Sequence, residues 1–469
     1  MTKSYSLIVI GAGAAGLVVA LGAAKAGKKT LLIDKGTWGG DCTNFGCIPS
    51  KTLIASAQAA HAARTLDRYG IMPPSTSLDC SGALKRTREM VKHIRVAEEP
   101  EALREKGVDT VEGEAKFIDP DTVEVNGERY RAKRFVIATG SRPKIPKIDG
   151  LESIPFLTNE TLFGLQEIPQ RLAVLGGGPI GCEMAQAFAR LGAQVFLIHH
   201  HPHILQKEER QASEVIEKLF VDERISLYLN HQTCRARQEN GNICLDLLDK
   251  NTGGEKELSA THLLLSVGRV ANTETLNLEA AGVETCKKGI KVNSYGKTSQ
   301  SHIFAAGDVT GDDFFTHAAE NRARTLLTNL LLPWPLRFRI DTAQAMPRVT
   351  FTDPEIASAG LSEKQAMAVY GYKKITTYRI PFSQVDRAET AGKIEGYIAI
   401  ATKKWTSKIL GVTIVGPRAS EMLQEVTLAM HQGISLRKLS SLIHPYPTYS
   451  LAVRKAADMW FLKTILRRG

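Results

Sequence analysis

The sequence has little of what marks a secreted, a zinc-binding or a nucleic-acid-binding protein. Seven cysteines are spread over 469 residues, too thinly for a secreted disulfide framework, and no second C-x-x-C motif completes a zinc site. The net charge is +11, yet no long basic run or arginine-rich tract is present, which argues against nucleic acid. A charge of this sign still suits an acidic membrane face or anionic small molecules.

A long apolar run is also absent, although residues 7–24 at first suggest one. They carry no charge and approach the length of a membrane span or a signal peptide. Gly11, Gly13, Gly16 and Gly22 interrupt the run, and the pattern G-x-G-x-x-G is typical of a nucleotide-binding loop. We therefore expect neither a membrane span nor a signal peptide here.

The first glycine loop stands in the context that a dinucleotide-binding unit requires. Leu7–Ile10 predicts a buried parallel strand, an alanine-rich helix follows the loop to about Lys25, and Thr30–Asp34 predicts the second strand. The glycines let a pyrophosphate approach the backbone at a helix N-terminus. Asp34 is placed to accept hydrogen bonds from an adenosine ribose.

A second unit of the same kind begins at Leu172–Leu175. Gly176, Gly178 and Gly181 repeat the glycine pattern, and Val195–Ile198 predicts the second strand. Two such units predict two dinucleotide sites or an internal duplication. The 43% hydrophobic and 23% charged content indicates a globular chain of two to four domains.

Two cysteines, Cys42 and Cys47, lie in the stretch Gly39–Lys51 after the first unit. Residues 51–69 predict a helix that Pro49 can begin, so both thiols are expected one turn apart at its N-terminus. There the helix dipole favours a thiolate. Core cysteines or half of a zinc site are the alternatives. We interpret the pair as a redox-active dithiol, which needs a reducing compartment, and we expect a cytoplasmic protein.

This stretch resembles the active-site signature of the flavoprotein disulfide reductases, the family of dihydrolipoamide dehydrogenase, glutathione reductase and mercuric reductase. The family pattern begins Gly-Gly-Thr-Cys, whereas Asp41 replaces the threonine here, and an acid there should avoid a flavin pyrophosphate. The resemblance implies a homodimeric enzyme in which NAD(P)H reduces FAD and FAD reduces a Cys42–Cys47 disulfide. By the same resemblance Cys47 faces the flavin and Cys42 meets the substrate.

Further motifs carry the resemblance along the chain in the family's order. Phe135–Gly140 is similar to the end of the first FAD segment, and Val267–Asn272 to the Gly-Arg-x-Pro-Asn signature, with Ala271 in place of the proline. Thr298–Asp308 is similar to the second FAD motif, which implies that Asp308 binds the ribityl chain.

The resemblance and the glycine loops together give the residues expected to contact FAD and the nicotinamide cofactor. They are Gly11, Gly13, Ala14, Ala15, Gly16, Asp34, Lys35, Gly40, Lys51, Glu114, Ala115, Ala138, Thr139, Gly140, Gly176, Gly178, Pro179, Ile180, Gly181, His199, His200, Gly268, Arg269, Gly307 and Asp308. No resident metal is expected.

The choice of nicotinamide depends on the end of the second unit's second strand. That strand is followed by His199–His203 without an acid. An acid there would favour the ribose of NAD, and a basic group would accommodate the 2′-phosphate of NADP. The resemblance puts His200 where NADPH-dependent members carry an arginine. A solvated loop and a His-rich metal tract are the alternatives, so NADPH is preferred and NADH stays open.

Glu183 lies two residues after Gly181 on the same predicted helix. The resemblance implies an ion pair between Glu183 and Lys51 that tunes the environment of the flavin. A surface acid on that helix is the alternative.

The chain departs from the family near its C-terminus. Dihydrolipoamide dehydrogenase and glutathione reductase carry a histidine before Pro-Thr and a glutamate shortly after it, which serve as acid and base from the second subunit. Here Tyr446 takes the histidine position and Leu451 the glutamate position, with His444 nearby at a different spacing. Tyrosine has a pKa of about 10, too high for an efficient base at neutral pH. We regard Tyr446 and His444 as catalytic candidates and expect poor turnover of disulfides.

Mercuric reductase resembles this chain in having a tyrosine near this place. It needs a C-terminal cysteine pair, whereas the last cysteine here is Cys286. The expected function is electron transfer from NAD(P)H through FAD and the dithiol to a small acceptor such as an oxidant, a metal ion or a quinone. A dihydrolipoamide dehydrogenase with an unconventional acid and a flavin-bound redox sensor or scaffold are the alternatives.

The expected fold is α/β, with two Rossmann-like dinucleotide-binding domains and a C-terminal α+β dimerisation domain. The expected boundaries are 1–149 for the first part of the FAD-binding domain, 150–269 for the NAD(P)-binding domain, 270–345 for the second FAD part and 346–469 for dimerisation. The run Met459–Arg468 predicts a dimer-interface helix or a peripheral membrane anchor.

Local patterns predict a few further elements. Residues 82–107 are expected to form one charged helix, and Asn126-Gly127 a hairpin turn. In the last domain we expect strands near 373–381, 396–402 and 409–415 and helices at 419–432 and 435–443. A helix and then a linker around 333–337 should precede this domain.

Overall fold

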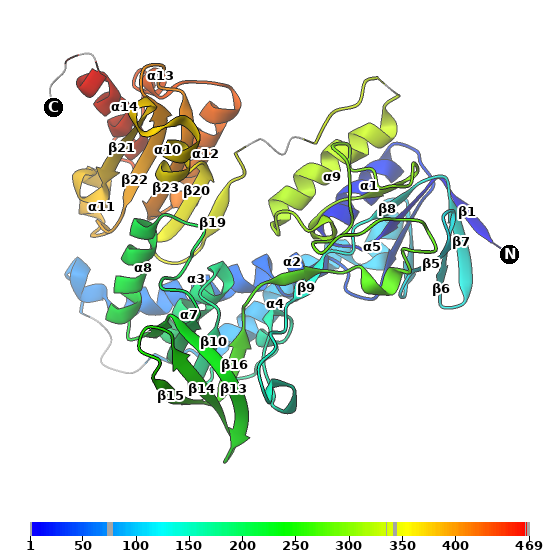
Figure 1. Cartoon of the computed structure of the whole chain (residues 1–469), viewed down its shortest axis with the longest axis horizontal. Helices are drawn as coiled ribbons and strands as arrows, with labels where there is room; N and C mark the ends of the chain where they lie inside the picture. Colours follow the sequence, from blue (N-terminus) through cyan, green and yellow to red (C-terminus); the bar gives the residue numbers. More distant parts are fainter. Residues whose placement is uncertain (1, 73–77, 334, 341–344, 465, 467–469) are drawn as a thin grey trace.

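The computed structural model describes residues 2–72, 78–333, 335–340, 345–464 and 466. Figure 1 shows three parts, each centred on a β-sheet, with the long helix α3 (Cys47–Arg64) running from the first part toward the other two. Trp334 of the expected linker lies outside the described residues, as do residues 465 and 467–469 of the tail.

The first part is built on a parallel sheet of five strands in the order β18-β8-β2-β3-β4. Helices α1 and α9 cover one face of it, and a smaller sheet, β1-β7-β6-β5, packs on the other through Phe117, Val123 and Tyr130. The elements are β1 Lys3–Tyr5, β2 Leu7–Ile10, α1 Ala14–Lys25, β3 Thr30–Asp34, β4 Val108–Glu112, β5 Lys116–Asp119, β6 Thr122–Val125, β7 Glu128–Ala132, β8 Phe135–Ile137, β18 Ile303–Ala305 and α9 Thr316–Leu331.

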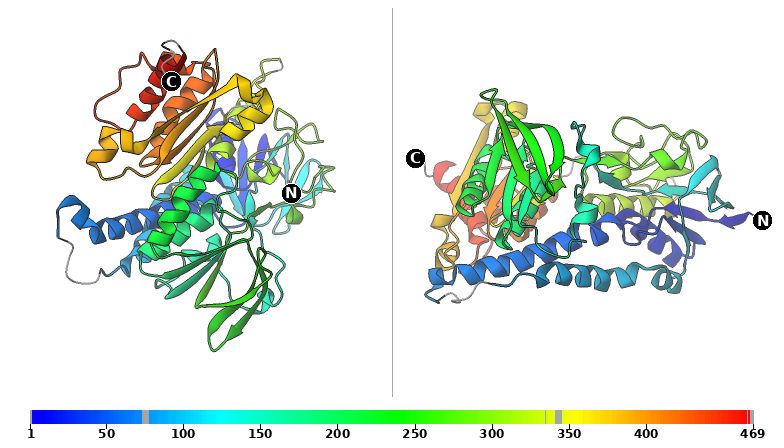
Figure 2. Two further views of the ribbon diagram at one scale, coloured as in Figure 1. Left: turned by 60° about the vertical axis from the view of Figure 1, so that its left-hand side comes forward. Right: turned by 90° about the horizontal axis from the view of Figure 1, so that it is seen from below.

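A group of helices connects this sheet to the rest of the molecule. These are α2 Gly40–Asn44, α3, α4 Gly82–Arg95 and α5 Pro100–Glu105. The view from below in Figure 2 shows α3 and α4 along one long edge of the molecule. Leu53, Ile54 and Ala57 of α3 share a core with α7 of the second part, so α3 is fixed between the first and second parts.

The second part has a parallel sheet in the order β12-β11-β10-β16 and an antiparallel one, β13-β14-β15. The two Rossmann sheets share the same strand–loop–helix–strand start, because each glycine loop joins a buried strand to a helix. The elements are α6 Asn159–Leu162, β10 Arg171–Leu175, α7 Pro179–Arg190, β11 Gln194–His199, α8 Arg210–Asp222, β12 Ser226–Leu229, β13 His231–Glu239, β14 Asn242–Asp249, β15 Glu255–Ala260 and β16 His262–Leu265. Short strands β9 (Ser141–Pro143) and β17 (Arg269–Ala271) pair where the first and second parts join.

The third part is an antiparallel sheet in the order β19-β20-β23-β22-β21. Helices α12 and α14 bury their apolar sides on it, and the left view in Figure 2 shows this part beside the second one. The elements are β19 Arg348–Thr350, β20 Glu355–Gly360, α10 Glu363–Tyr370, β21 Ile375–Pro381, α11 Asp386–Thr390, β22 Tyr397–Lys403, β23 Ile409–Gly416, α12 Ala419–His431, α13 Leu436–Leu439 and α14 Leu451–Thr464.

The predicted α/β architecture is confirmed, while several helix limits differ. The helix expected at residues 51–69 begins earlier, at Cys47, and ends at Arg64. The helix expected at 82–107 is two helices, because α4 ends at Arg95 and Pro100 starts α5 after a 3-10 turn at Val96–Glu98. The helix expected at 435–443 is only α13, Leu436–Leu439.

Candidate active site

The first glycine loop is shaped for close backbone approach. Gly11 has a φ of +106°, and a Cβ on it would lie 2.4 Å from the carbonyl oxygen of Ala138. A Cβ on Gly16 would lie 1.8 Å from the oxygen of Gly11. Gly13 caps α1 without any side-chain hydrogen bond, and the first turn holds no acid. The free N–H groups of this turn fit the pyrophosphate of FAD.

Asp34 ends β3 beside this loop. Its carboxylate accepts hydrogen bonds from the backbone N–H groups of Ala12 (2.7 Å), Gly36 (3.0 Å) and Thr37 (2.7 Å). The acid therefore ties the loop to the strand end, and spare lone pairs on its two oxygens can still accept from a ribose hydroxyl.

The two cysteines lie on consecutive helices rather than on one. Cys42 is in α2, and Cys47 is the first residue of α3; both are free thiols, with Cys47 exposed. A hydrogen bond from Cys42 lowers the pKa of Cys47 to about 6, helped by the Thr316 hydroxyl, whose Oγ1 lies 3.4 Å from the sulfur, and by the charge of Lys51. Donating that bond and being partly buried raise the pKa of Cys42.

The predicted partners Lys51 and Glu183 form an ion pair. Lys51 Nζ lies 2.8 Å from Glu183 Oε2, and Glu183 is buried on α7. Its other oxygen, Oε1, accepts the backbone N–H of Phe351 at 2.9 Å, and the Lys51 ammonium lies 4.4 Å from the centre of the Phe351 ring. All three parts of the molecule thus meet beside Cys47.

Asp41, the acid that replaces the family's threonine, is neutralised by neighbours. Its Oδ1 accepts from Asn159 Nδ2 at 2.9 Å and lies 3.2 Å from a guanidinium nitrogen of Arg269. Arg269 also donates to the Ser141 hydroxyl at 2.7 Å, and that hydroxyl donates to Asp308 at 2.6 Å. Burial raises the pKa of Asp308. The network pairs Asp41 with Arg269, and the expectation that this acid avoids a flavin pyrophosphate stays a prediction.

The remaining cofactor candidates lie around these groups. Ala14 and Ala15 begin α1, Ala138, Thr139 and Gly140 follow β8, and Gly307 follows β18. Lys35 and Glu114 are exposed, whereas Ala115 is buried. Gly40 begins α2, and a Cβ on it would lie 2.5 Å from the Cα of Gly13, so α2, which carries Cys42, lies directly against the glycine loop.

The second loop repeats the first with one chemical change. Gly177 N–H donates to His199 Nδ1 at 3.1 Å, just as Ala12 N–H donates to Asp34. Burial, and then the neighbouring histidines, lower the pKa of His199 to about 4; burial and the charges of His201 and Lys250 lower that of His200. His199 is therefore neutral at pH 7, and His200 is the exposed ring at this strand end.

The other residues of the second loop leave room for a ligand. Gly178 has nothing within 4 Å of where a Cβ would stand, and it caps α7 without a side-chain bond. Pro179 is the first residue of that helix, Ile180 is exposed, and Gly181 packs on Gly176. Gly268 has an open Cβ position as well.

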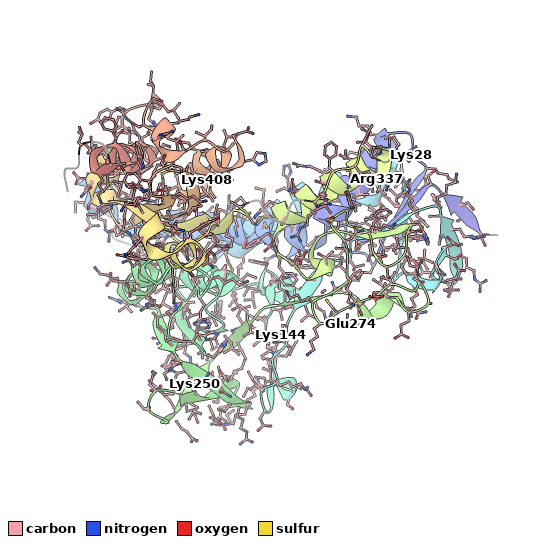
Figure 3. All side chains as sticks on the ribbon, turned by 45° about the horizontal axis from the view of Figure 1, so that its top comes forward. Lys28, Lys144, Lys250, Glu274, Arg337 and Lys408 are labelled. Carbon is pink, nitrogen blue, oxygen red and sulfur yellow. The ribbon has the colours of Figure 1, made fainter. Side chains whose placement is uncertain are left out.

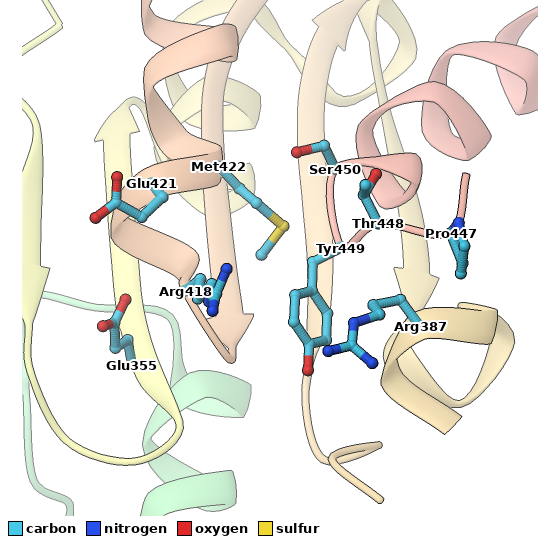
Figure 4. Close-up of a pocket in the computed structure, with 9 residues that line it drawn as sticks. All are labelled: Glu355, Arg387, Arg418, Glu421, Met422, Pro447, Thr448, Tyr449 and Ser450. Carbon is cyan, nitrogen blue, oxygen red and sulfur yellow. The ribbon is translucent and has the colours of Figure 1, made fainter. Parts of the chain in front are cut away.

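The C-terminal candidates lie on the third part. Tyr446 is 73% exposed and donates its hydroxyl hydrogen to Asp386 Oδ2 at 2.8 Å; that bond raises the pKa of the tyrosine. His444 is buried, with Nε2 3.0 Å from Glu425 Oε1 and Nδ1 3.1 Å from the oxygen of Leu442. Among the described residues, no hydrogen bond or ion pair connects Tyr446 or His444 to Cys47 of the same chain. Residues 447–450, which follow Tyr446, line a pocket of about 520 Å³, and Arg387 and Arg418 also lie on its walls. Figure 4 shows these side chains around the pocket.

Several groups of the site carry no signal in the sequence. Thr316 reaches Cys47, Phe351 reaches Glu183 and Asn159 reaches Asp41, each from a distant element. Asp386 reaches Tyr446 in the same way. In the described part of the chain no cluster of three or more His, Cys, Asp or Glu is arranged to hold a metal ion. Over the same residues no helix has the length and apolar character needed to cross a bilayer.

Comparison with known proteins agrees with this geometry. Residues 5–343 match the pyridine nucleotide-disulphide oxidoreductase family, and residues 346–457 match the dimerisation domain of that family. A mercuric reductase of Lysinibacillus sphaericus is 35% identical over 98% of this chain and 84% of its own length. A dihydrolipoyl dehydrogenase of Thermus scotoductus is 34% identical over 97% of each chain.

Among solved structures, the Cu(II) complex of the HOCl-induced flavoprotein disulfide reductase RclA from Escherichia coli is similar. Its TM-score is 0.88 at 26% identity, covering 98% of this chain and 100% of that one. The matched dimerisation domain implies that this chain, too, forms a homodimer.

Proposed function

Because the chain belongs to the pyridine nucleotide-disulphide oxidoreductase family, whose members are FAD-dependent enzymes, we propose that it passes electrons from NAD(P)H to a thiophilic metal ion held by Cys42 and Cys47. FAD, when bound, carries the electron pair from the nicotinamide to the disulfide of the two cysteines. In this proposal residues 1–149 and 270–345 hold FAD, 150–269 hold the nicotinamide nucleotide, and 346–469 form the dimer.

The proposal rests on the hydrogen bond that Tyr446 donates and on its raised pKa. Its hydroxyl hydrogen is committed to Asp386 and its pKa is raised, so it is a poor proton donor and no base at neutral pH. Reduction of a disulfide by NAD(P)H consumes a proton and yields two thiols, which requires protonation of the leaving thiolate. Reduction of two Cu(II) to Cu(I), or of one Hg(II) to Hg(0), by NAD(P)H instead releases a proton.

The dithiol suits such an acceptor. A thiol with a pKa near 6 is mostly thiolate at neutral pH, and thiolates are the preferred ligands of soft metals such as Cu(I). Cys47 would face the flavin between Thr316 and Lys51, and Cys42 would meet the metal ion. Two relatives, a mercuric reductase and RclA bound to Cu(II), have names that point to metal ions.

For the nucleotide we propose NADPH. The strand end carries no acid, and exposed His200 is available for a 2′-phosphate. His199 is a second, neutral donor at the same strand end. Its Nδ1 accepts the N–H of Gly177, so Nε2 carries the hydrogen, and Nε2 has no partner among the described residues.

Anaerobic NADPH oxidation by the FAD-loaded homodimer tests the proposal with Cu(II), Hg(II), lipoamide and glutathione disulfide as acceptors. We expect steady turnover with a metal ion, monitored for copper by a Cu(I) chelator, and disulfide rates lower by at least about 10²-fold. Cys42→Ser should abolish metal turnover, whereas Cys286→Ser, at an exposed cysteine outside the site, should not. Lipoamide turnover as fast as metal turnover would overturn the proposal, and a single stoichiometric reduction that then stops would favour a redox sensor.

A further inference from the structure

One end of the sheet in the third part gathers basic side chains. There β21 begins, β22 ends and β23 begins, with Ile375 opposite Lys403 and Thr402 opposite Ile409. We call the surface formed by residues 369–374, 403–408 and 437–438 the basic face. Its seven cations are Lys373, Lys374, Lys403, Lys404, Lys408, Arg437 and Lys438, and the three segments contain no aspartate or glutamate.

Backbone hydrogen bonds make these segments one continuous surface. Lys404 N–H donates to the oxygen of Lys374 at 2.9 Å, and Leu436 N–H donates to the oxygen of Ser407 at 2.9 Å. Arg437 N–H donates to the Ser407 hydroxyl at 3.3 Å. In Figure 1 this is the end of the sheet near α13, opposite the end near α11.

The charges of the basic face have no acidic partners among the described residues. Elsewhere in the same part, Arg379 pairs with Glu209 and Glu363. Three of the seven cations lie over aromatic rings: Lys403 is 4.6 Å from the ring centre of Tyr370, Lys404 is 5.8 Å from that of Trp405, and Arg437 is 5.9 Å from that of Trp460. An unneutralised cluster of this kind attracts an anionic surface.

Large apolar side chains stand among these cations. Trp405 is 74% exposed, Tyr372 76% and Val369 64%, and Trp405 lies in the turn between β22 and β23. Tryptophan and tyrosine favour the boundary between lipid headgroups and acyl chains, and lysines beside them reach anionic headgroups. We propose that the basic face is a docking surface for an anionic lipid membrane.

Lipid fits this face better than nucleic acid does. Six of the seven cations are lysines, which act as point charges toward headgroups, whereas reading of bases relies largely on the fork of arginine. Val369 has no planar ring on which a base could stack. The face also lies at the opposite end of the sheet from Asp386 and Tyr446, so docking leaves the catalytic candidates free.

Co-sedimentation with vesicles tests the proposal on the full-length FAD-loaded homodimer. The probes are vesicles of phosphatidylcholine with phosphatidylserine and vesicles of phosphatidylcholine alone. We expect binding to the anionic vesicles only, weakening as salt rises. Each lysine contributes about fivefold to the partition coefficient, the equivalent of about 1 kcal/mol, so Lys373→Gln, Lys404→Gln and Lys408→Gln together should lower it about 100-fold.

Two controls make the test specific. The triple variant Lys28→Gln, Lys144→Gln and Lys287→Gln removes the same charge from exposed positions elsewhere and should leave binding nearly unchanged. Figure 3 labels Lys28 and Lys144 of this control and Lys408 of the basic face. Trp405→Ala should weaken binding several-fold while all charges stay.

Four results would overturn the proposal. They are equal loss in both triple variants, equal binding to uncharged vesicles, tighter binding to a DNA duplex or RNA strand than to the vesicles, and dissociation of the homodimer on size-exclusion chromatography of the Lys373/Lys404/Lys408 variant. The last result would assign the face to contacts between two copies.

Discussion

Two replacements of Cys42 separate the hydrogen bond that it donates from the disulfide that it forms. Cys42→Ser and Cys42→Ala both abolish the disulfide, but serine keeps an O–H donor beside Cys47. The hydrogen bond from Cys42 is the largest influence that lowers the pKa of Cys47 to about 6, ahead of Thr316 and Lys51, while burial acts in the opposite direction. The alanine variant should therefore have the higher pKa at Cys47.

The size of the difference follows from the energy of that bond. A hydrogen bond to a charged group contributes about 1.5–3 kcal/mol, and one pKa unit corresponds to 1.36 kcal/mol. Losing the donor should therefore raise the pKa of Cys47 by about 1–2 units. Near pH 7, Cys47 should then be mostly thiolate in the serine variant, whereas a larger share of it should be protonated in the alanine variant.

The long-wavelength charge-transfer absorbance between a thiolate and oxidised FAD reports the thiolate directly. Both variants should show this band without any reductant, with a midpoint near pH 6 for Cys42→Ser and a higher one for Cys42→Ala. Thr316→Val, combined with Cys42→Ser, should raise the midpoint by less than the alanine replacement does. Equal midpoints for serine and alanine would refute the assignment of the hydrogen bond, and a band seen only in Cys47→Ser would reverse the roles of the two cysteines.

Three further predictions concern the nucleotide, the acceptor and stability. His200→Arg places a permanent cation at the strand end and should raise the preference for NADPH over NADH at least about tenfold, measured by the two KM values at neutral pH. Tyr446→His should raise lipoamide turnover by about 10²–10⁴-fold with metal turnover unchanged, because Asp386 can orient the new imidazole; no gain would mean that the partner subunit does not present this residue to the dithiol. Arg190→Met strips the buried partner from Glu223 and Asp353 and should cost about 3–5 kcal/mol, seen as a lower Tm, whereas Arg104→Met on the surface should change little.

The sequence predicted those parts of the fold that local patterns specify. Leu7–Ile10 and Thr30–Asp34 were expected as strands and are strands, because short apolar runs before and after a glycine loop leave few alternatives. The turn at Asn126-Gly127 joins β6 and β7 as predicted, with both residues at positive φ. The limits of α3 were misjudged because α2 ends at Asn44 and Gly46 caps a new helix that begins at Cys47, so that the cysteines fall on two helices.

Of the residues in the site, the sequence predicted only those that belong to a recognisable motif. Lys51 and Glu183 were paired from a resemblance and do form an ion pair. Asn159, Thr316 and Phe351 were missed because each lies more than 100 positions from the group that it contacts, and a single hydrogen bond leaves no periodic pattern. Leu451, which stands at the family's glutamate position, is buried at the start of α14, so a glutamate there would bury a charge.

The Lys51–Glu183 pair links the reactive sulfur to the dimerisation domain. Glu183 is held by Lys51 through one oxygen and by the backbone of Phe351 through the other, and the Phe351 ring faces the same ammonium. The charge of Lys51 lowers the pKa of Cys47 and that of Glu183 raises it. A displacement of β19 and the residues after it would therefore move two charges that act on the thiolate in opposite directions. Since these residues belong to the dimerisation domain, association of the two subunits and the acidity of Cys47 are expected to be coupled.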